Sequence, residues 1–382
     1  MNNLLRIAKV LMCGLICVAL APTLAGSRVL AQGKGSVKGV VKDEKGKPLP
    51  DVNITLQMGD APEIQLTTDK DGKFAKTGLP VGTYTISYTI HDVPKIERPL
   101  RIVDGKDTDA TLDMNDKNVA DYIKARKAEA EDEAKFGKLK AHFDAGAAAL
   151  QQEQSAHDQL VKAPADQRPA LQDKVDATAA TAISEFKEAL AVTAPTEVNN
   201  IAAINNSLGQ ASDLEGKYDE AAQYYTQSAT AKPDAGVYNN MGIDLAKAGK
   251  LDDAKAAFEK SAQLDPAGAA KAFRNFGAVA SNAGHMNDPA VMELLKKATD
   301  LDPKNAQGWY LYATVLVANM QTKQEGEKMT VILLPGTVEA YQKCIDVDPN
   351  GPYAEQARQG LDALKSMGVG IDTKVTAPKT KH

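Results

Sequence analysis

Residues that often carry catalysis or bind metal ions occur in this chain, but not at the spacings that such chemistry needs. A zinc site built on an H-x-x-E pair needs a glutamate three residues after a histidine. None of the following has one: His91, His142, His157 and His285. Asp69 and Asp71 precede Gly72 without the ligand spacing of a calcium loop, so a tight hairpin turn is the preferred interpretation. No nucleophile elbow or phosphate-binding loop is found, and the sequence predicts a protein that is not an enzyme and has no cofactor or metal.

The first residues predict a secretory signal peptide. Arg6 and Lys9 precede an apolar run over residues 10–21, which is too short to span a bilayer. Small residues allow cleavage after Ala31, with Ala25 as a second option. We therefore expect residues 1–31 to be removed from an exported protein that is periplasmic, associated with the cell envelope or secreted, and not integral to a membrane.

Charge and cysteine content limit the partners and the covalent chemistry. Loss of residues 1–31 removes three basic residues and no acidic ones, so the formal net charge moves from −5 to −8. An acidic chain without a basic stripe is not expected to bind nucleic acid. Cys13 and Cys17 do not follow the small residue that a lipoprotein signal needs, and both leave with the signal peptide. Only Cys344 remains, so no intramolecular disulfide can form.

A pattern of small, aromatic and proline residues repeats within residues 205–266. The first copy consists of Gly209, Gly216, Lys217, Asp219, Ala221, Tyr225, Ser228 and Pro233. It returns 33 residues later as Gly242, Gly249, Lys250, Asp252, Ala254, Phe258, Ser261 and Pro266. A period in the low thirties indicates a helix-turn-helix solenoid. Because a glycine inside a helix costs roughly 1 kcal/mol relative to alanine, we expect two helix backbones to approach closely at Gly209 and Gly242.

This register resembles the tetratricopeptide repeat family. The resemblance implies stacked α-hairpins over residues 141–367, with copies at 202–234, 235–267, 270–304 and 306–350. Phe143 and Phe186 are expected to belong to a degenerate first pair that is interrupted by polar residues around Pro164 and Pro169. Trp309 and Cys344 are expected in the core. The apolar residues 329–334 lie in an insertion that we expect to fold back over the solenoid, with contact to a partner as the alternative. A closing helix is expected over residues 354–364, and a disordered tail over residues 368–382.

Short alternating strands separated by turn signals fill residues 33–114. Residues 39–52, 68–74 and 79–84 resemble the carboxypeptidase regulatory-like family, which implies an immunoglobulin-like or prealbumin-like sandwich grouped with carbohydrate-binding-like folds. Because none of its histidines has the H-x-x-E spacing, we expect no carboxypeptidase catalytic domain in this sequence. A charged helical linker, capped by Asp116, is expected over residues 115–140. The predicted fold class is therefore multidomain, with an all-β sandwich followed by an all-α solenoid.

The first helix of each repeat is expected to face a concave groove that binds a protein or peptide. The residues predicted on this face are Asn206, Gln210, Asn239, Asn240, Ile243, Lys271, Arg274, Tyr310 and Thr314. Some members of the family grip a C-terminal carboxylate with lysine, asparagine and arginine. Asn240 and Lys271 are similar to that clamp, Arg274 is one residue away from the arginine position, and Asn206 replaces the first lysine. Contact through amides is therefore preferred over a true carboxylate clamp.

The resulting hypothesis is an exported, non-enzymatic scaffold that binds a protein or peptide through the concave face of its repeats. The alternative is a module whose β-sandwich binds polysaccharide while the solenoid recruits proteins. Sugar binding usually needs exposed aromatic platforms, and the β region has no tryptophan. Phe74, Tyr84 and Tyr88 are interpreted as core residues.

Overall fold

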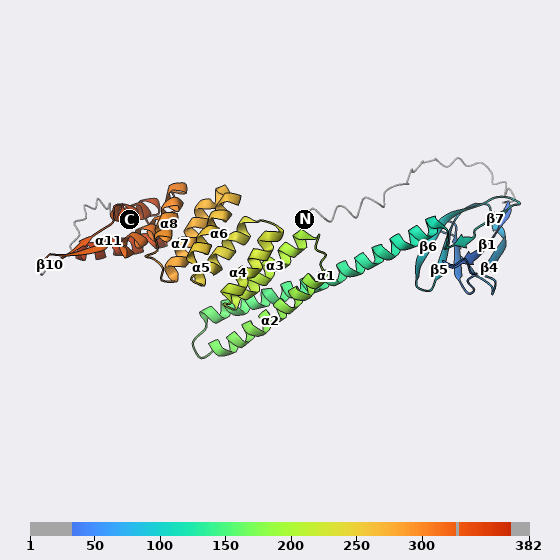
Figure 1. The fold of residues 1–382 in the computed structure, drawn as a ribbon, viewed down its shortest axis with the longest axis horizontal. Helices are drawn as coiled ribbons and strands as arrows, with labels where there is room; N and C mark the ends of the chain where they lie inside the picture. Colours follow the sequence, from blue (N-terminus) through green and yellow to red (C-terminus); the bar gives the residue numbers. More distant parts are fainter. Residues whose placement is uncertain (1–32, 326–327, 368–382) are drawn as a thin grey trace, which may run out of the picture. The chain divides into compact units, whose positions relative to one another are not determined.

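The computed structural model describes residues 33–325 and 328–367, and these form two compact units that meet between Glu131 and Asp132 (Figure 1). The expected signal peptide over residues 1–31 and the expected tail over residues 368–382 lie outside the described residues. Within the described part of the chain, no helix is long and apolar enough to cross a membrane.

The first unit consists of two β-sheets and the start of a helix. Its strands are β1 (Lys34–Lys42), β2 (Asn53–Gln57), β3 (Ile64–Thr67), β4 (Lys73–Pro80), β5 (Gly82–Ile90), β6 (Val93–Ile102), β7 (Asp107–Asp109) and β8 (Leu112–Asp113). One sheet has the order β4-β1-β7, with β8 also paired to β1, and the other has the order β3-β2-β5-β6. Strand β1 pairs antiparallel with β4 but parallel with β7 and β8. The predicted all-β fold is confirmed.

One hydrophobic core fills the space between these two sheets. The rings of Phe74 on β4 and Tyr88 on β5 meet edge to face, with their centroids 6.3 Å apart. Phe74, Tyr84 and Tyr88 are 5%, 2% and 0% exposed, as expected for core residues. The guanidinium of Arg98 donates to the hydroxyl of Tyr88 at 2.9 Å and so satisfies a buried polar group.

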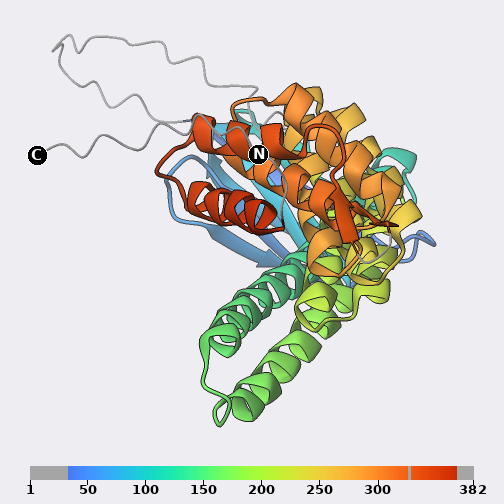
Figure 2. The ribbon, with the colours of Figure 1, turned by 90° about the vertical axis from the view of Figure 1, so that its left-hand side faces the viewer.

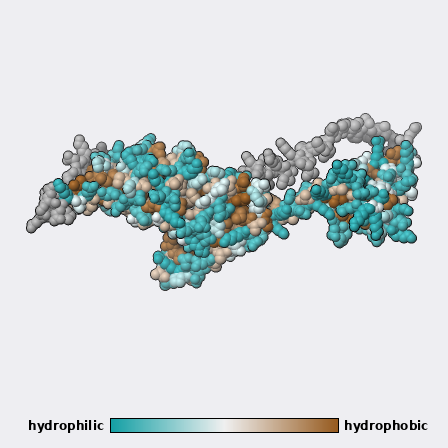
Figure 3. All heavy atoms as spheres, viewed as in Figure 1, coloured by the Kyte–Doolittle hydropathy of each residue, from teal (hydrophilic) through white to brown (hydrophobic). Residues whose placement is uncertain are grey.

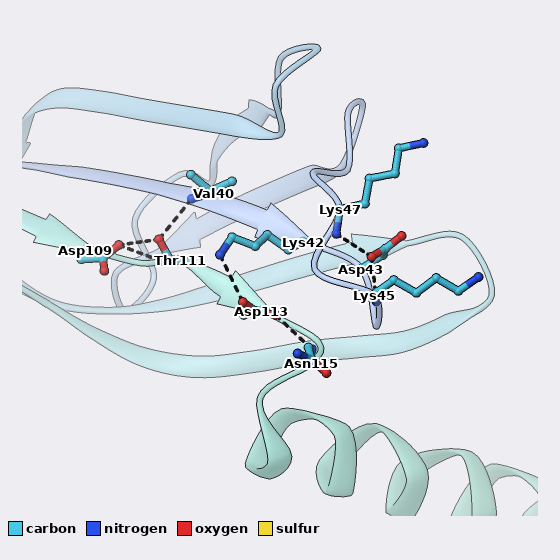
Figure 4. Close-up of polar contacts among 9 residues, drawn as sticks. All are labelled: Val40, Lys42, Asp43, Lys45, Lys47, Asp109, Thr111, Asp113 and Asn115. Atoms are coloured by element: carbon cyan, nitrogen blue, oxygen red, sulfur yellow. Dashed lines mark hydrogen bonds and ion pairs between the residues drawn. The ribbon is translucent and has the colours of Figure 1, made fainter.

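Two aspartates hold tight turns in the same way. The Oδ1 atom of Asp43 accepts hydrogen bonds from the backbone amides of Lys45 and Lys47, both at 2.8 Å (Figure 4). The Oδ1 atom of Asp69 accepts from the amides of Asp71 and Lys73, both at 2.9 Å. An aspartate that bonds the backbone two and four residues ahead closes the turn between two strands. The tight turn expected before Gly72 is therefore present, but it joins β3 to β4, which belong to different sheets and do not form a hairpin.

The helix that follows the sheets is longer than the expected linker. Asp116 caps it, because its Oδ1 atom accepts a hydrogen bond from the amide of Asn118 at 2.8 Å. Helix α1 then runs over Lys117–Lys162 without a break, so most of the expected linker over residues 115–140 forms its first part. Within the first unit, Ile123 is 4% exposed and packs against the β core.

The second unit is helical. After α1 come α2 (Arg168–Val192), α3 (Val198–Leu214), α4 (Tyr218–Ala231), α5 (Ala235–Lys247), α6 (Leu251–Leu264), η2 (Pro266–Gly268), α7 (Ala269–Asn282), α8 (Pro289–Leu301), α9 (Ala306–Ala318), β9 (Gln321–Glu325), β10 (Lys328–Ile332), α10 (Thr337–Val347) and α11 (Pro352–Ser366). Successive helices pair as α3 with α4, α5 with α6, α7 with α8 and α9 with α10, and α11 follows the last pair (Figure 2). The predicted all-α solenoid is confirmed.

The repeated glycines make room for an aromatic ring. A Cβ atom added to Gly242 would lie 2.7 Å from the ring of Phe258, and one added to Gly209 would lie 2.7 Å from the ring of Tyr225. We expected two helix backbones to approach closely at these glycines, and this expectation was wrong. The space beside each glycine is instead filled by the aromatic side chain of the paired helix. A second repeated contact accompanies it, since Ser228 and Ser261 each donate a hydrogen bond at 2.8 Å to a carbonyl 26 residues earlier.

In the first helix pair, α1 and α2, an aromatic ring also packs against a glycine, but both helices are longer than expected. Phe143 on α1 packs edge to face on Phe186 of α2 at 5.6 Å, and a Cβ atom on Gly146 would lie 2.8 Å from Phe186. The polar residues expected to interrupt the pair extend both helices instead. Pro169 fits in the first turn of α2, where a proline has no intrahelical hydrogen bond to lose.

The insertion between α9 and α10 contains the hairpin of β9 and β10, which the sequence did not predict. Leu333 and Leu334 pack against the core around α10 and α11, as expected for a segment that folds back, whereas Ile332 is 44% exposed. Cys344 is fully buried, and the partly buried Trp309 donates from its Nε1 atom to the carbonyl of Pro303 at 2.9 Å.

Substitution Gly242→Ala tests the packing of rings into glycine sites. Overpacking a core costs about 1–3 kcal/mol, whereas alanine gains about 1 kcal/mol in helix propensity. Because the clash is with a fully buried ring, we expect the packing cost to exceed this gain and to give a net loss of up to about 2 kcal/mol in the free energy of unfolding. Urea denaturation followed by circular dichroism measures this loss, and a second substitution, Phe258→Leu, should restore part of it.

The matched control is Gly137→Ala on α1, where no atom lies within 4 Å of the added Cβ. This variant should be as stable as the wild type or more stable. Equal effects of the two alanine substitutions would contradict the packing explanation.

Candidate functional site

The residues predicted for the groove all lie on the first helices of the repeats. Asn206 and Gln210 are on α3, Asn239, Asn240 and Ile243 on α5, Lys271 and Arg274 on α7, and Tyr310 and Thr314 on α9. Each is partly or fully exposed. We call the surface formed by these nine residues the first-helix face.

Three of these residues come together around a cavity, and the others do not. Gln210, Asn240 and Ile243 line a hollow of about 200 Å³. Asn239 instead accepts a hydrogen bond from Asn275 on α7 at 3.0 Å. Tyr310 packs against the rings of Tyr341 and Tyr353, with centroids 6.4 and 5.5 Å away. The remaining predicted residues are not part of this cavity.

The cavity has a polar lining contributed by four helices. Its other lining residues are Gln154 from α1, Asp213 and Leu214 from α3, Tyr225 from α4 and Asp244 from α5. We call this hollow the α1–α3–α5 cavity.

Asp244 is the most deeply buried charged group at the cavity. It is 1% exposed, and its Oδ2 atom has no hydrogen-bond partner among the described residues. Its Oδ1 atom lies 3.5 Å from the Nζ atom of Lys247, which also contacts Asp213. Burial, followed by the negative charge of Asp213 and a hydrogen bond with it, raises the pKa of Asp244 to about 8. The folded state therefore favours the protonated form of this carboxyl group.

Lys247 keeps its charge beside this pair of carboxyl groups. Burial lowers the pKa of Lys247, but its contacts with Asp213 and Asp244 outweigh that effect, and the pKa lies above its ordinary value. The ammonium also lies 4.8 Å from the ring centroid of Tyr218. Lys247 thus supplies one fixed cation at the edge of the acidic cluster.

A second buried acid lies near the cavity, on α1. Glu153 is 0% exposed, and neither of its carboxylate oxygens has a hydrogen-bond partner among the described residues. Burial, with added repulsion from Glu215 and Asp213, raises the pKa of Glu153 to about 8. Lys217 pairs with Glu215 at 3.0 Å. Four acids, three of them on α1, α3 and α5 and the fourth at the C-cap of α3, therefore gather around the end of α3.

Sequence reasoning missed these acids, although a comparison of the two repeats contains the signal. Asp244 occupies the place that Ala211 has in the preceding copy, and Asp213 occupies the place that Ala246 has in the following one. Both alanines are 0% exposed. An acid at such a position is a candidate for a buried charge, and of the two only Asp244 is buried, whereas Asp213 is partly exposed. Among the described residues, no group of three or more histidines, cysteines, aspartates and glutamates is arranged to hold a metal ion.

Comparisons with known proteins agree with the two family resemblances. Residues 36–115 match the family model of the carboxypeptidase regulatory-like domain. Residues 202–234 and 235–267 match family models of the tetratricopeptide repeat. Both resemblances drawn from the sequence are confirmed. A comparison with curated proteins gave no significant match.

Similar solved structures include YrrB, described as a TPR protein with an unusual peptide-binding site, at 16% identity and a TM-score of 0.34, covering 50% of this chain and 89% of that one. MamA from Desulfovibrio magneticus RS-1 has 22% identity and a TM-score of 0.31, covering 45% of this chain and 98% of that one. Yeast Tom70 has 13% identity and a TM-score of 0.30, covering 58% of this chain and 53% of that one.

The buried acids predict how stability depends on pH. A carboxyl group whose pKa is raised by folding binds more protons in the folded state, so the free energy of unfolding falls as pH rises from about 4 to about 8. The substitution Glu153→Gln removes one of these groups. We expect a flatter pH dependence and a more stable helical unit at pH 8, measured by urea denaturation between about pH 5 and about pH 9.

The control is Glu133→Gln, an exposed position on the same helix, which should keep the pH dependence of the wild type. The explanation would be contradicted if Glu153→Gln and the wild type lost stability in parallel with rising pH.

Proposed function

We propose that this protein is an exported, non-enzymatic scaffold that binds a protein or peptide along the first-helix face. The matches to tetratricopeptide repeats indicate a role in protein–protein interaction. The observation that carries the finer proposal is the α1–α3–α5 cavity, because it opens between consecutive first helices and is lined by Gln210, Asn240 and Ile243. Concave, polar sites of this kind fix the orientation of a bound chain.

The charges on the first-helix face favour an internal segment of a partner over a free C-terminus. Asn240 lines the cavity together with Asp213, so a carboxylate bound there would meet the negative charge of Asp213. Lys271 and Arg274 lie on α7 and form no ion pair with another described residue. A partner segment with a basic group near α3 and α5 and an acidic group near α7 would match this distribution.

The visible surface of the helical unit also favours polar recognition. In the view of Figure 3, hydrophilic side chains cover most of α3 to α8, and hydrophobic surface shows only in scattered areas. A broad apolar contact is therefore not expected on this side, and hydrogen bonds and charge pairs should dominate the interface.

The remaining parts of the proposal rest on the sequence and the family matches. Tetratricopeptide repeats and regulatory-like domains are typically non-enzymatic, which supports a scaffold. The apolar run over residues 10–21 after Arg6 and Lys9 supports export. The polysaccharide alternative gains no support from Phe74, Tyr84 or Tyr88, since all three rings are buried and offer no platform to a sugar.

The double substitution Asn240→Ala with Lys271→Ala tests the first-helix face. We expect capture of partners from a cell-envelope extract to weaken at least about tenfold, which corresponds to about 1.4 kcal/mol of binding free energy. The mature protein is immobilised, and captured proteins are quantified by mass spectrometry.

The matched control is Gln227→Ala with Lys260→Ala, at exposed positions on the second helices α4 and α6. It should capture as much as the wild type. Unchanged capture by the first-helix variant would remove the site assignment. Capture that persists without residues 117–382 and is competed by polysaccharide would favour the β-sandwich instead.

A further inference from the structure

The wall of the α1–α3–α5 cavity holds a carboxylate oxygen without a partner. Asp244 is 1% exposed yet lines the cavity, and its Oδ2 atom accepts no hydrogen bond from any described residue. Buried polar atoms in folded proteins are nearly always hydrogen-bonded, so an orphaned acceptor at a cavity wall calls for a donor from elsewhere. The ligand that completes this site should therefore donate hydrogen bonds.

The other polar groups around the cavity extend the set of acceptors. Gln154, Gln210 and Asn240 each carry an amide oxygen, and Asp213 adds a second carboxylate. A ligand with several donors in one plane could use these acceptors together.

The volume of the cavity limits the ligand to a single head group. About 200 Å³ is roughly seven times the share of one molecule in liquid water. This space accommodates the end of one long side chain but not a folded segment. The rest of the partner would then lie along the first-helix face outside the cavity.

We propose that the α1–α3–α5 cavity binds the guanidinium group of an arginine in the partner, with Asp244 as its main acceptor. This inference rests on the proposed function of the first-helix face and names the chemistry that the face recognises. A guanidinium presents five N–H donors in a rigid plane and no acceptor, which suits a cavity lined by carboxylate and amide oxygens.

Arginine fits this site better than lysine does. An ammonium is a compact, strongly hydrated charge, whereas a guanidinium is more weakly hydrated and enters a buried pocket more readily. One ammonium is already present, since Lys247 lies 3.5 Å from the Oδ1 atom of Asp244 and leaves the Oδ2 atom open. The remaining oxygen is the one that an incoming guanidinium would engage.

Binding of a cation at Asp244 should release a proton. The groups that face this carboxyl are Asp213 on α3, Tyr225 on α4 and Lys247 on its own helix, and Glu153 on α1 adds a further acid beside Asp213. Because the pKa of Asp244 is raised to about 8, a guanidinium has to displace the proton at neutral pH. The affinity should therefore rise with pH until Asp244 is ionised without the ligand.

The test uses Nα-acetyl-arginine methylamide as the probe and its citrulline analogue, which has nearly the same shape but no charge, as the control ligand. Two-dimensional NMR of the mature protein follows the side-chain amide signals of Gln210 and Asn240. We expect saturable shifts with the arginine probe, binding at least about tenfold weaker with citrulline, and tighter arginine binding at about pH 9 than at about pH 7.

Substitution Asp244→Asn should weaken arginine binding at least about tenfold, whereas Asp253→Asn, an exposed position on α6, should not change it. Equal binding of the arginine and citrulline probes, or unchanged arginine binding in Asp244→Asn, would overturn the proposal. The comparison of the two probes on the wild type decides the question even if Asp244→Asn does not fold.

The outcomes also separate this inference from the proposed function. If Asn240→Ala with Lys271→Ala abolishes partner capture but the arginine probe causes no shifts, the face is the binding site and the arginine pocket is wrong. If the probe binds the cavity but capture is unaffected by that double substitution, the pocket stands and the proposed function fails.

Discussion

The solenoid depends on the insertion of an aromatic ring into the space that a missing side chain leaves on the neighbouring helix. The pairs Gly209 with Tyr225, Gly242 with Phe258 and Gly146 with Phe186 all show this contact, with ring atoms 2.7 to 2.8 Å from where a Cβ atom would lie. Such contacts fix the distance and rotation of each helix pair, because a packed interior tolerates little change in volume. The first helices are therefore held in one register, and residues far apart in the sequence can form a single face.

The candidate site lies where acidic residues interrupt this regular packing of small and apolar side chains. Asp213 and Asp244 stand at positions where the other copy of the repeat buries an alanine, and α1 adds Glu153 beside Asp213. Burial of acids without full pairing lowers stability, so their presence against an otherwise small and apolar pattern favours a functional explanation. The same cluster accounts for the raised pKa values of Asp244 and Glu153, because each acid is buried beside other carboxylates.

Local features of the sequence were sufficient to predict much of the fold. The 33-residue spacing from Gly209 to Gly242 predicted the α-hairpins, and turn residues such as Asp69 and Gly72 predicted a tight turn between two strands of the β unit. Features that depend on distant contacts were missed. The polar residues around Pro164 gave no sign that α1 and α2 would extend, and Asn240 was placed on the first-helix face without its acidic neighbours. Burial of an acid depends on which helix covers it, and that is not visible in a single sequence.

The central claim is that partners lie along the first-helix face. It is tested most directly by placing a photo-crosslinking amino acid at position 240 and, separately, at position 227 of the full-length protein in the producing cell. Helices α5 and α4 carry these two positions. The account predicts that irradiation links a partner protein at position 240 and not at position 227. Partner crosslinks at position 227 alone, or at neither position in cells where the intact protein is recovered with its partner, would contradict it.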